Sequence, residues 1–239
     1  MARSHAPALA LFDIDGTLVR RAGSHHREAL VEAIRRVTGF DTTTDGIPLY
    51  GMLDPDILRE MLRRADAPAR VAREALPAIQ TAAERIYRRT CPPIARKTCP
   101  GVRRLLGGLE RRGVAMGLVT GNLTRIGWWK LERAGLRRYF RFGAFGEMAR
   151  DRAGLVRLAL RRARQEGWIA AATPVSLVGD APADILAARA NGVRSVSVAT
   201  GLLAAAELAA YSPDVLLEDL RALDFAELFD PPLVYRSVR

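Results

Sequence analysis

Near the N-terminus the chain reads Ala8-Leu-Ala-Leu-Phe-Asp-Ile-Asp-Gly-Thr-Leu18. Its first five residues form a nearly continuous apolar run, which is typical of a parallel strand buried on both faces. The predicted strand stops at Asp13, and because side chains alternate along an extended chain, Asp13 and Asp15 point to the same side. One carboxylate can attack an electrophile while the other moves protons, provided that a cation suppresses their repulsion. The alternative is an acidic turn capped by Thr17.

Similar apolar runs recur later in the chain, at residues 114–120, 175–178 and 193–198. Helix-like stretches separate them, and strands that alternate with helices indicate an α/β fold with a Rossmann-like parallel sheet and right-handed crossovers. In such sheets ligands bind beyond the carboxyl ends of the strands. The polar residues of this sequence collect at these predicted strand ends.

Between the first strand and about residue 100 the pattern changes. No convincing buried strand occurs there, whereas residues 27–37, 55–64 and 69–88 have the periodicity of amphipathic helices. We therefore predict an α-helical unit inserted into the core. The expected domains are a core of residues 1–19 and 100–239 and this inserted helical unit of residues 20–99, which the resemblance described below implies to be a cap.

Two further segments place polar groups at predicted strand ends. Leu118-Val-Thr-Gly-Asn122 offers a hydroxyl and backbone N–H groups at the start of a helix, which favours anion binding, although a cap and turn would have the same pattern. Val178-Gly-Asp-Ala-Pro-Ala-Asp184 carries two carboxylates that suit a hard divalent cation such as Mg²⁺. By itself Asp180, followed by Pro182, could merely cap a helix.

In this order, the three segments resemble the haloacid dehalogenase superfamily, whose pattern is Asp-x-Asp-Gly-Thr, a strand-terminal Ser or Thr, a basic residue and Gly-Asp-x-x-x-Asp. The resemblance covers residues 8–201 and is strongest to members similar to phosphoglycolate phosphatase, which carry a helical cap after the first motif. Gly51-Met-Leu-Asp-Pro-Asp56 is similar to a cap segment of these relatives, with Leu53 where Thr is expected. A helix N-cap at Asp54 is the alternative for this segment.

The resemblance implies a role for each motif residue. Asp13 is implied to attack phosphorus and to form an aspartyl-phosphate, while Asp15 protonates the leaving alcohol and later activates water. Mg²⁺ is implied to bind the carboxylates of Asp13 and Asp180 and the backbone carbonyl of Asp15, with Asp184 in or next to the coordination shell. The groups implied to hold the transferring oxygens are Thr120, Gly121, Asn122 and a basic residue.

The basic residue of the third motif is normally a lysine, but residues 145–153 contain none. We select Arg152 because a guanidinium also binds phosphate. Arg150 and Lys130 are the other candidates, and ordinary surface charge is the alternative for all three. His25 and His26 near the entry to the cap are expected to be solvated hinge residues, with substrate contact as the alternative.

The expected function is that of a phosphoric monoester hydrolase acting on a small phosphorylated metabolite, with phosphoglycolate as the first candidate. The aspartate at position 15 argues against dehalogenation or phosphonate cleavage. The resemblance implies that this aspartate protonates an alkoxide leaving group, which those two reactions do not need. The alternatives are a sugar-phosphate mutase of the same superfamily and a catalytically silent module that binds a phosphorylated ligand.

Composition limits the partners. The net charge of +11 could attract nucleic acid, but arginine pairs are spread over separate predicted helices, and Lys97 and Lys130 are the only lysines. We therefore expect solvated helix faces and no nucleic-acid partner. The apolar runs are far shorter than the ~20 residues that span a bilayer, and no export signal is evident. The prediction is a cytoplasmic protein without a membrane partner, and no pattern indicates an oligomeric state.

Overall fold

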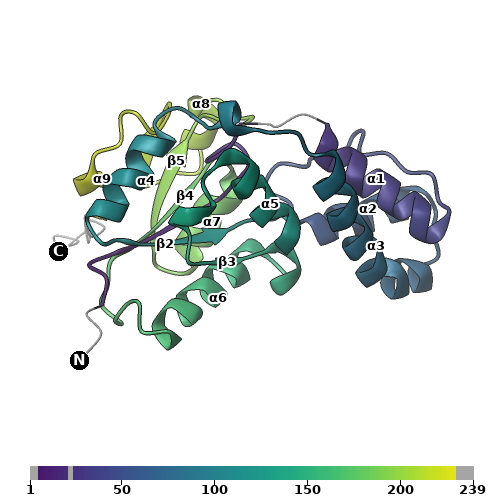
Figure 1. Ribbon diagram of the computed structural model, residues 1–239, viewed down its shortest axis with the longest axis horizontal. Helices are drawn as coiled ribbons and strands as arrows, with labels where there is room; N and C mark the ends of the chain where they lie inside the picture. The colour runs from purple at the N-terminus through teal and green to yellow at the C-terminus, as the bar shows by residue number, and fades with distance from the viewer. Residues whose placement is uncertain (1–4, 21–23, 230–239) are drawn as a thin grey trace, which may run out of the picture.

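The computed structural model describes residues 5–20 and 24–229. Its core is a six-stranded parallel sheet in the order β3-β2-β1-β4-β5-β6 (Figure 1). The strands are β1 (Leu9–Phe12), β2 (Ala115–Val119), β3 (Phe142–Ala144), β4 (Val175–Gly179), β5 (Arg194–Val198) and β6 (Val215–Leu217). The predicted α/β class is confirmed, and β1 lies at the centre, where its two neighbours run in the same direction.

The central strand is apolar on both faces because helices cover both. Leu9 and Leu11 pack in one cluster with residues of α6 and α7, whereas Ala10 and Phe12 pack in a second cluster with residues of α4, α5 and α9. This split follows from the alternation of side chains along a strand. The core helices are α4 (Val102–Arg111), α5 (Thr124–Ala134), α6 (Arg152–Gln165), α7 (Pro182–Ala190), α8 (Ala205–Ala209) and α9 (Phe225–Phe229).

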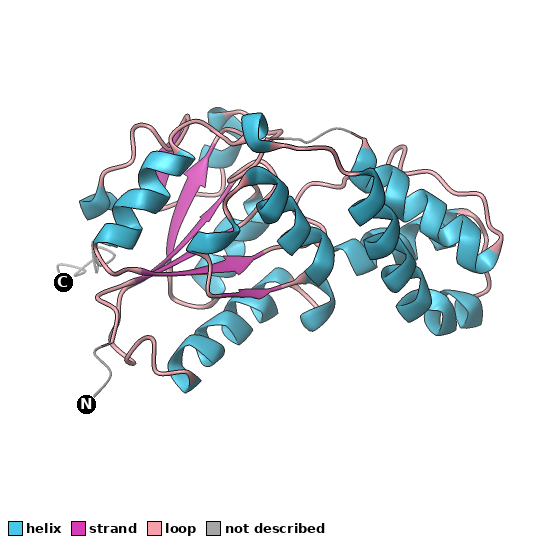
Figure 2. Cartoon of the chain, viewed as in Figure 1, coloured by secondary structure: helices cyan, strands magenta, loops and turns pink. Residues whose placement is uncertain are grey.

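Three helices form a separate unit beside the sheet, and Figure 2 draws no strand among the described residues of this unit. They are α1 (His25–Thr38), α2 (Asp54–Arg64) and α3 (Ala69–Thr90). Each predicted cap helix is thus present, with ends that differ by at most two residues at any terminus from the expected ones. The buried residues of α1, which include Ala29, Leu30, Ala33 and Ile34, lie on the face expected from helical periodicity.

The chain leaves and re-enters the core through two adjacent segments. The N–H of Arg20 donates to the carbonyl of Lys97 at 2.7 Å, and the N–H of Cys99 donates to the carbonyl of Leu18 at 3.0 Å. The domain boundaries expected after residues 19 and 99 stay a prediction, and residues 1–4, 21–23 and 230–239 of those domains lie outside the described part of the chain.

Some elements were not expected from sequence. Strands β3 and β6 have three residues each, too few for a recognisable alternation. The short 3₁₀ helices are η1 (Ala95–Lys97), η2 (Arg137–Tyr139) and η3 (Gly146–Met148).

Candidate active site

Three carboxylates meet at the carboxyl edge of the sheet. Asp13 follows β1 and Asp180 follows β4, and these strands pair with Phe12 opposite Val178. Asp184 joins them from the first turn of α7. One oxygen from each carboxylate lies within 4.8 Å of the others, and all three residues are buried. Oxygen donors gathered in this way can hold a hard divalent cation.

The carboxylate cluster has more negative charge than the protein neutralises. Burial, together with the charges of Asp13 and Asp184, holds the pKa of Asp180 well above its usual range. Burial also raises the pKa of Asp184, although the nearby Arg152 opposes this. Three carboxylates share one guanidinium, so their full ionisation would leave an excess of two negative charges. Oδ1 of Asp13 is buried and accepts no hydrogen bond from the described residues, so the cluster fits a bound divalent ion.

Arg152 is the basic residue that reaches this cluster. It is the first residue of α6, and the N-cap residue Asp151 fixes the start of the helix by accepting a backbone hydrogen bond at 2.7 Å. Nη1 of Arg152 lies 2.7 Å from Oδ1 of Asp184 and 3.4 Å from Oδ1 of Asp13. Burial disfavours the charged guanidinium, but the carboxylates outweigh it and raise the pKa of Arg152. Arg150 is exposed.

The second motif follows β2 and lines the same cleft. Nδ2 of Asn122 donates to Oγ1 of Thr120 at 2.7 Å and to Oδ2 of Asp15 at 2.8 Å. The hydroxyl of Thr120 acts as an acceptor here, so its hydrogen is available to a ligand. A Cβ atom at Gly121 would overlap the backbone carbonyl of Met52, so only glycine permits the cap to approach this closely.

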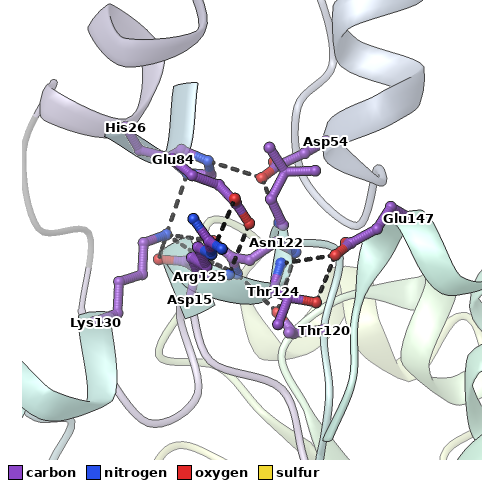
Figure 3. Close-up of polar contacts among 11 residues, drawn as sticks. Asp15, His26, Asp54, Glu84, Thr120, Asn122, Thr124, Arg125, Lys130 and Glu147 are labelled. Carbon is purple, nitrogen blue, oxygen red and sulfur yellow. Dashed lines mark hydrogen bonds and ion pairs between the residues drawn. The ribbon is translucent and has the colours of Figure 1, made fainter. Parts of the chain in front are cut away.

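A buried lysine contacts the second aspartate of the first motif (Figure 3). Nζ of Lys130, on α5, lies 2.7 Å from Oδ1 and 2.6 Å from Oδ2 of Asp15, and it donates to Oδ1 of Asn122 at 2.6 Å. Nδ1 of His26, on α1, is 3.1 Å away. Burial raises the pKa of Asp15, but the positive charge of Lys130 and the other contacts outweigh it and bring that pKa below its usual value.

The cap reaches the core through Asp54. Its Oδ2 accepts the N–H of Leu123 at 2.8 Å and lies 3.0 Å from Nε2 of His26. The alternative of a helix N-cap at this position is wrong, because Leu53 is the N-cap residue and Asp54 is the first residue of α2. Its carboxylate serves the contact between cap and core instead.

A cleft of 340 Å³ lies between the cap and the core. This volume falls in the range of small-molecule sites. The core side of its lining includes Asp13, Asp15, Thr120, Asn122, Lys130, Arg152 and Asp180. The cap side includes His25, His26, Arg27, Leu30, Tyr50, Gly51, Met52, Asp54, Ile57 and Tyr87.

Comparison with known proteins decides the family. The sequence model of the haloacid dehalogenase-like hydrolases matches residues 7–192. The chain belongs to this family. A phosphoglycolate phosphatase of Synechococcus elongatus is 32% identical, over 87% of this chain and 91% of that protein. A phosphoglycolate phosphatase of Pseudomonas fluorescens is 30% identical, over 91% of this chain and 78% of that protein.

Solved structures share the fold of this hydrolase. CbbY from Rhodobacter sphaeroides, in complex with phosphate, superposes with a TM-score of 0.69 at 21% identity and covers 92% of this chain and 98% of that one. A β-phosphoglucomutase from Clostridium difficile reaches a TM-score of 0.71 at 20% identity, over 92% of this chain and 93% of that one. The predictions of the family, of the fold and of a hydrolytic enzyme are confirmed.

The structure corrects further interpretations of this hydrolase's sequence. Lys130 is not a surface charge, because it is 1% exposed, and His26 is not a solvated hinge residue, because it lies within α1 and contacts Asp54 and Lys130. Surface charge is also wrong for Arg152. Lys130 lies four residues from both Ile126 and Ala134, which are buried on α5, so helical spacing carried a signal for its burial.

The catalytic and ligand-binding roles predicted for the motif residues stay predictions.

In the part of the chain that the structure describes, no helix is both long enough and apolar enough to span a bilayer.

Proposed function

We propose that the protein is a Mg²⁺-dependent phosphatase that hydrolyses a small phosphomonoester through an aspartyl-phosphate on Asp13. The observation that carries the proposal is the placement of Asp13 within the buried carboxylate cluster, with Asp13 and Asp15 both lining a small cleft. The phosphoglycolate phosphatases that the chain is similar to support the same reaction class.

Asp13 is suited to act as the nucleophile. Its Oδ1 is buried and accepts no hydrogen bond from the described residues, so its lone pairs are available to a metal ion or to phosphorus. The chemistry that Mg²⁺ supplies when held by Asp13, Asp180, Asp184 and the backbone carbonyl of Asp15 is the neutralisation of phosphate charge. Attack by Asp13 then forms a P–O bond as the bond from phosphorus to the substrate oxygen breaks.

The other residues divide the remaining work. Asp15 delivers a proton to the leaving oxygen and then removes one from the water that hydrolyses the aspartyl-phosphate. Thr120, the backbone at Gly121 and Arg152 hold the phosphoryl oxygens. Nε of Arg152 is buried and has no hydrogen-bond partner among the described residues, and a bound phosphate would satisfy such a donor.

Phosphoglycolate is the first substrate to test. It fits the size of the cleft, and its carboxylate would find hydrogen-bonding partners because the guanidinium of Arg27 and the imidazole of His25 also line the cleft. The walls on the cap side are otherwise mostly apolar, with Leu30, Ile57 and Tyr87 among them. The proposed ligand is therefore a small anion with a short carbon chain.

The test is phosphate release from a panel of small phosphomonoesters, with Mg²⁺ or with a chelator, for the wild type, Asp13→Asn and Asp41→Asn. Asp41 is exposed and does not line the cleft, so it is a matched control. We expect metal-dependent release that Asp13→Asn reduces by at least about 10³-fold, as for other catalytic nucleophiles. Isomerisation of a sugar phosphate without net phosphate release would favour the mutase, and binding without turnover of any compound would favour the silent module.

A further inference from the structure

The side chain of Lys130 joins the proposed acid–base group to the cap. We propose that Lys130 is a positioning residue that holds the carboxylate of Asp15 toward the leaving oxygen, and that His26 completes this arrangement only when the cap is docked. The proposal rests on the phosphatase function proposed above, because it assigns Asp15 the proton transfer. It concerns a residue outside the three quoted segments, residues 8–18, 118–122 and 178–184.

The hydrogen bonds of Lys130 form a complete set. An ammonium group has three donors and no acceptor, and Lys130 meets three groups, which are the carboxylate of Asp15, Oδ1 of Asn122 and Nδ1 of His26. A buried charge is costly unless it is paired and hydrogen-bonded. With Lys130 only 1% exposed, each of the three contacts therefore restrains the ammonium, and through it the carboxylate.

The third contact comes from the cap. Because Nδ1 of His26 accepts from Lys130, the hydrogen of the imidazole is on Nε2, which donates to Oδ2 of Asp54 at 3.0 Å. The ring of Tyr87, on α3, packs edge-on against His26, with centroids 5.7 Å apart, and its centroid is 5.8 Å from Nζ of Lys130. Undocking of the cap would remove Nδ1 of His26 as an acceptor and the ring of Tyr87 as a cover. One N–H of Lys130 would then donate to water.

A purely structural ion pair is the competing explanation, and dependence on the leaving group separates the two. An alkyl ester needs a proton on its leaving oxygen, whereas p-nitrophenolate is a weak base that departs without one. Misplacement of Asp15 should therefore lower kcat/KM much more for alkyl esters than for p-nitrophenyl phosphate. This ratio covers only the steps through departure of the leaving group, so the hydrolysis of the aspartyl-phosphate, which is common to both substrates, does not enter it. General loss of folded protein would slow both substrates equally.

The experiment compares Lys130→Met with Lys97→Met, which changes the exposed second lysine of the chain. With Mg²⁺, we expect Lys130→Met to lower kcat/KM for the best alkyl phosphate by about 10²-fold and kcat/KM for p-nitrophenyl phosphate by less than about tenfold. Lys97→Met should match the wild type on both substrates. Equal losses on the two substrates, or no loss, would overturn the positioning role. A wild type that releases no phosphate would instead refute the proposed function.

A second measurement needs no activity. The wild type and the variants His26→Ala and His25→Ala are acetylated briefly with acetic anhydride, and the labelling of each lysine is followed by mass spectrometry. Lys97 should react quickly in all three proteins, while Lys130 should be protected in the wild type and in His25→Ala. Labelling of Lys130 at least several-fold faster in His26→Ala supports the link to the cap, and an unchanged rate would overturn it.

Discussion

Arg152 shows why the identity of one cation matters at this site. A lysine offers a single charged atom, whereas the planar guanidinium of Arg152 directs Nη1 at both Asp184 and Asp13 and retains further donors. The side chain is buried, so little water could hydrogen-bond to the two carboxylates if the guanidinium were removed. Removing the guanidinium leaves buried charge without a partner, which is the costly way to break an ion pair.

Arg152→Gln is therefore expected to destabilise the metal-free protein by about 3–5 kcal/mol, the cost of removing one partner of a buried ion pair. The measurement is urea-induced unfolding in the presence of a chelator. Arg150→Gln, two residues away and exposed, is the control and should stay within about 0.5 kcal/mol of the wild type. Equal stabilities of the two variants would contradict the assignment of Arg152 to the carboxylate cluster.

At the scale of elements, the N-terminus of α5 is where the cap meets the core. Its N-cap residue, Leu123, has no side-chain oxygen, and three carboxylates from elsewhere bind the first N–H groups. Asp54 accepts from Leu123 and Glu84 accepts from Arg125 at 2.9 Å, both from the cap, while Glu147 of the core accepts from Thr124 at 3.1 Å (Figure 3). Carboxylates at a helix N-terminus accept hydrogen bonds from the free backbone N–H groups of the first turn and interact favourably with the positive end of the helix dipole.

Glu84→Ala should loosen this junction because Arg125 loses the acceptor for its N–H. We expect a loss of about 1 kcal/mol, as for other N-terminal capping groups, together with faster hydrogen exchange at the first amides of α5. Hydrogen exchange followed by mass spectrometry would detect the change. Glu74→Ala, an exposed position on the same helix, provides the comparison. Identical exchange of α5 in both variants would show that Glu84 does not contribute to docking.

At the scale of the whole molecule, the binding of a metal ion and the stability of the fold should be coupled. Asp13 follows β1, whereas Asp180 and Asp184 come from the end of β4 and the start of α7, far away in sequence, so folding itself brings like charges within 4.8 Å. The raised pKa of Asp180, due first to burial and then to its neighbours, is the consequence of this crowding. A ligand that binds only the folded state stabilises it.

Addition of Mg²⁺ should therefore raise the midpoint of thermal unfolding, with a gain of about 2.7 kcal/mol at a concentration near 100 times Kd. Asp180→Asn should make the metal-free protein more stable, because it removes one of the crowded charges, and should reduce the response to Mg²⁺. Differential scanning calorimetry at constant ionic strength would measure both effects. A wild type that does not respond to Mg²⁺ would exclude the carboxylate cluster as a magnesium site.

The amino-acid sequence by itself determined the fold class, the cap helices and the positions of Asp13 and Asp180. These depend on local patterns, because an apolar run followed by a carboxylate indicates a strand end, and helical periodicity indicates an amphipathic helix. The short strands β3 and β6 were not predicted, because three residues are too few to show such a pattern.

Only the tertiary structure decided which residues contact one another in the site. Lys130 is 115 positions from Asp15 and 104 from His26, and Asp54 is 69 positions from Leu123. No periodicity links positions so far apart, because their contacts arise only when the parallel strands align their ends and the cap packs against α5. Lys130, which the sequence alone would place among the surface charges, is therefore buried and contacts Asp15.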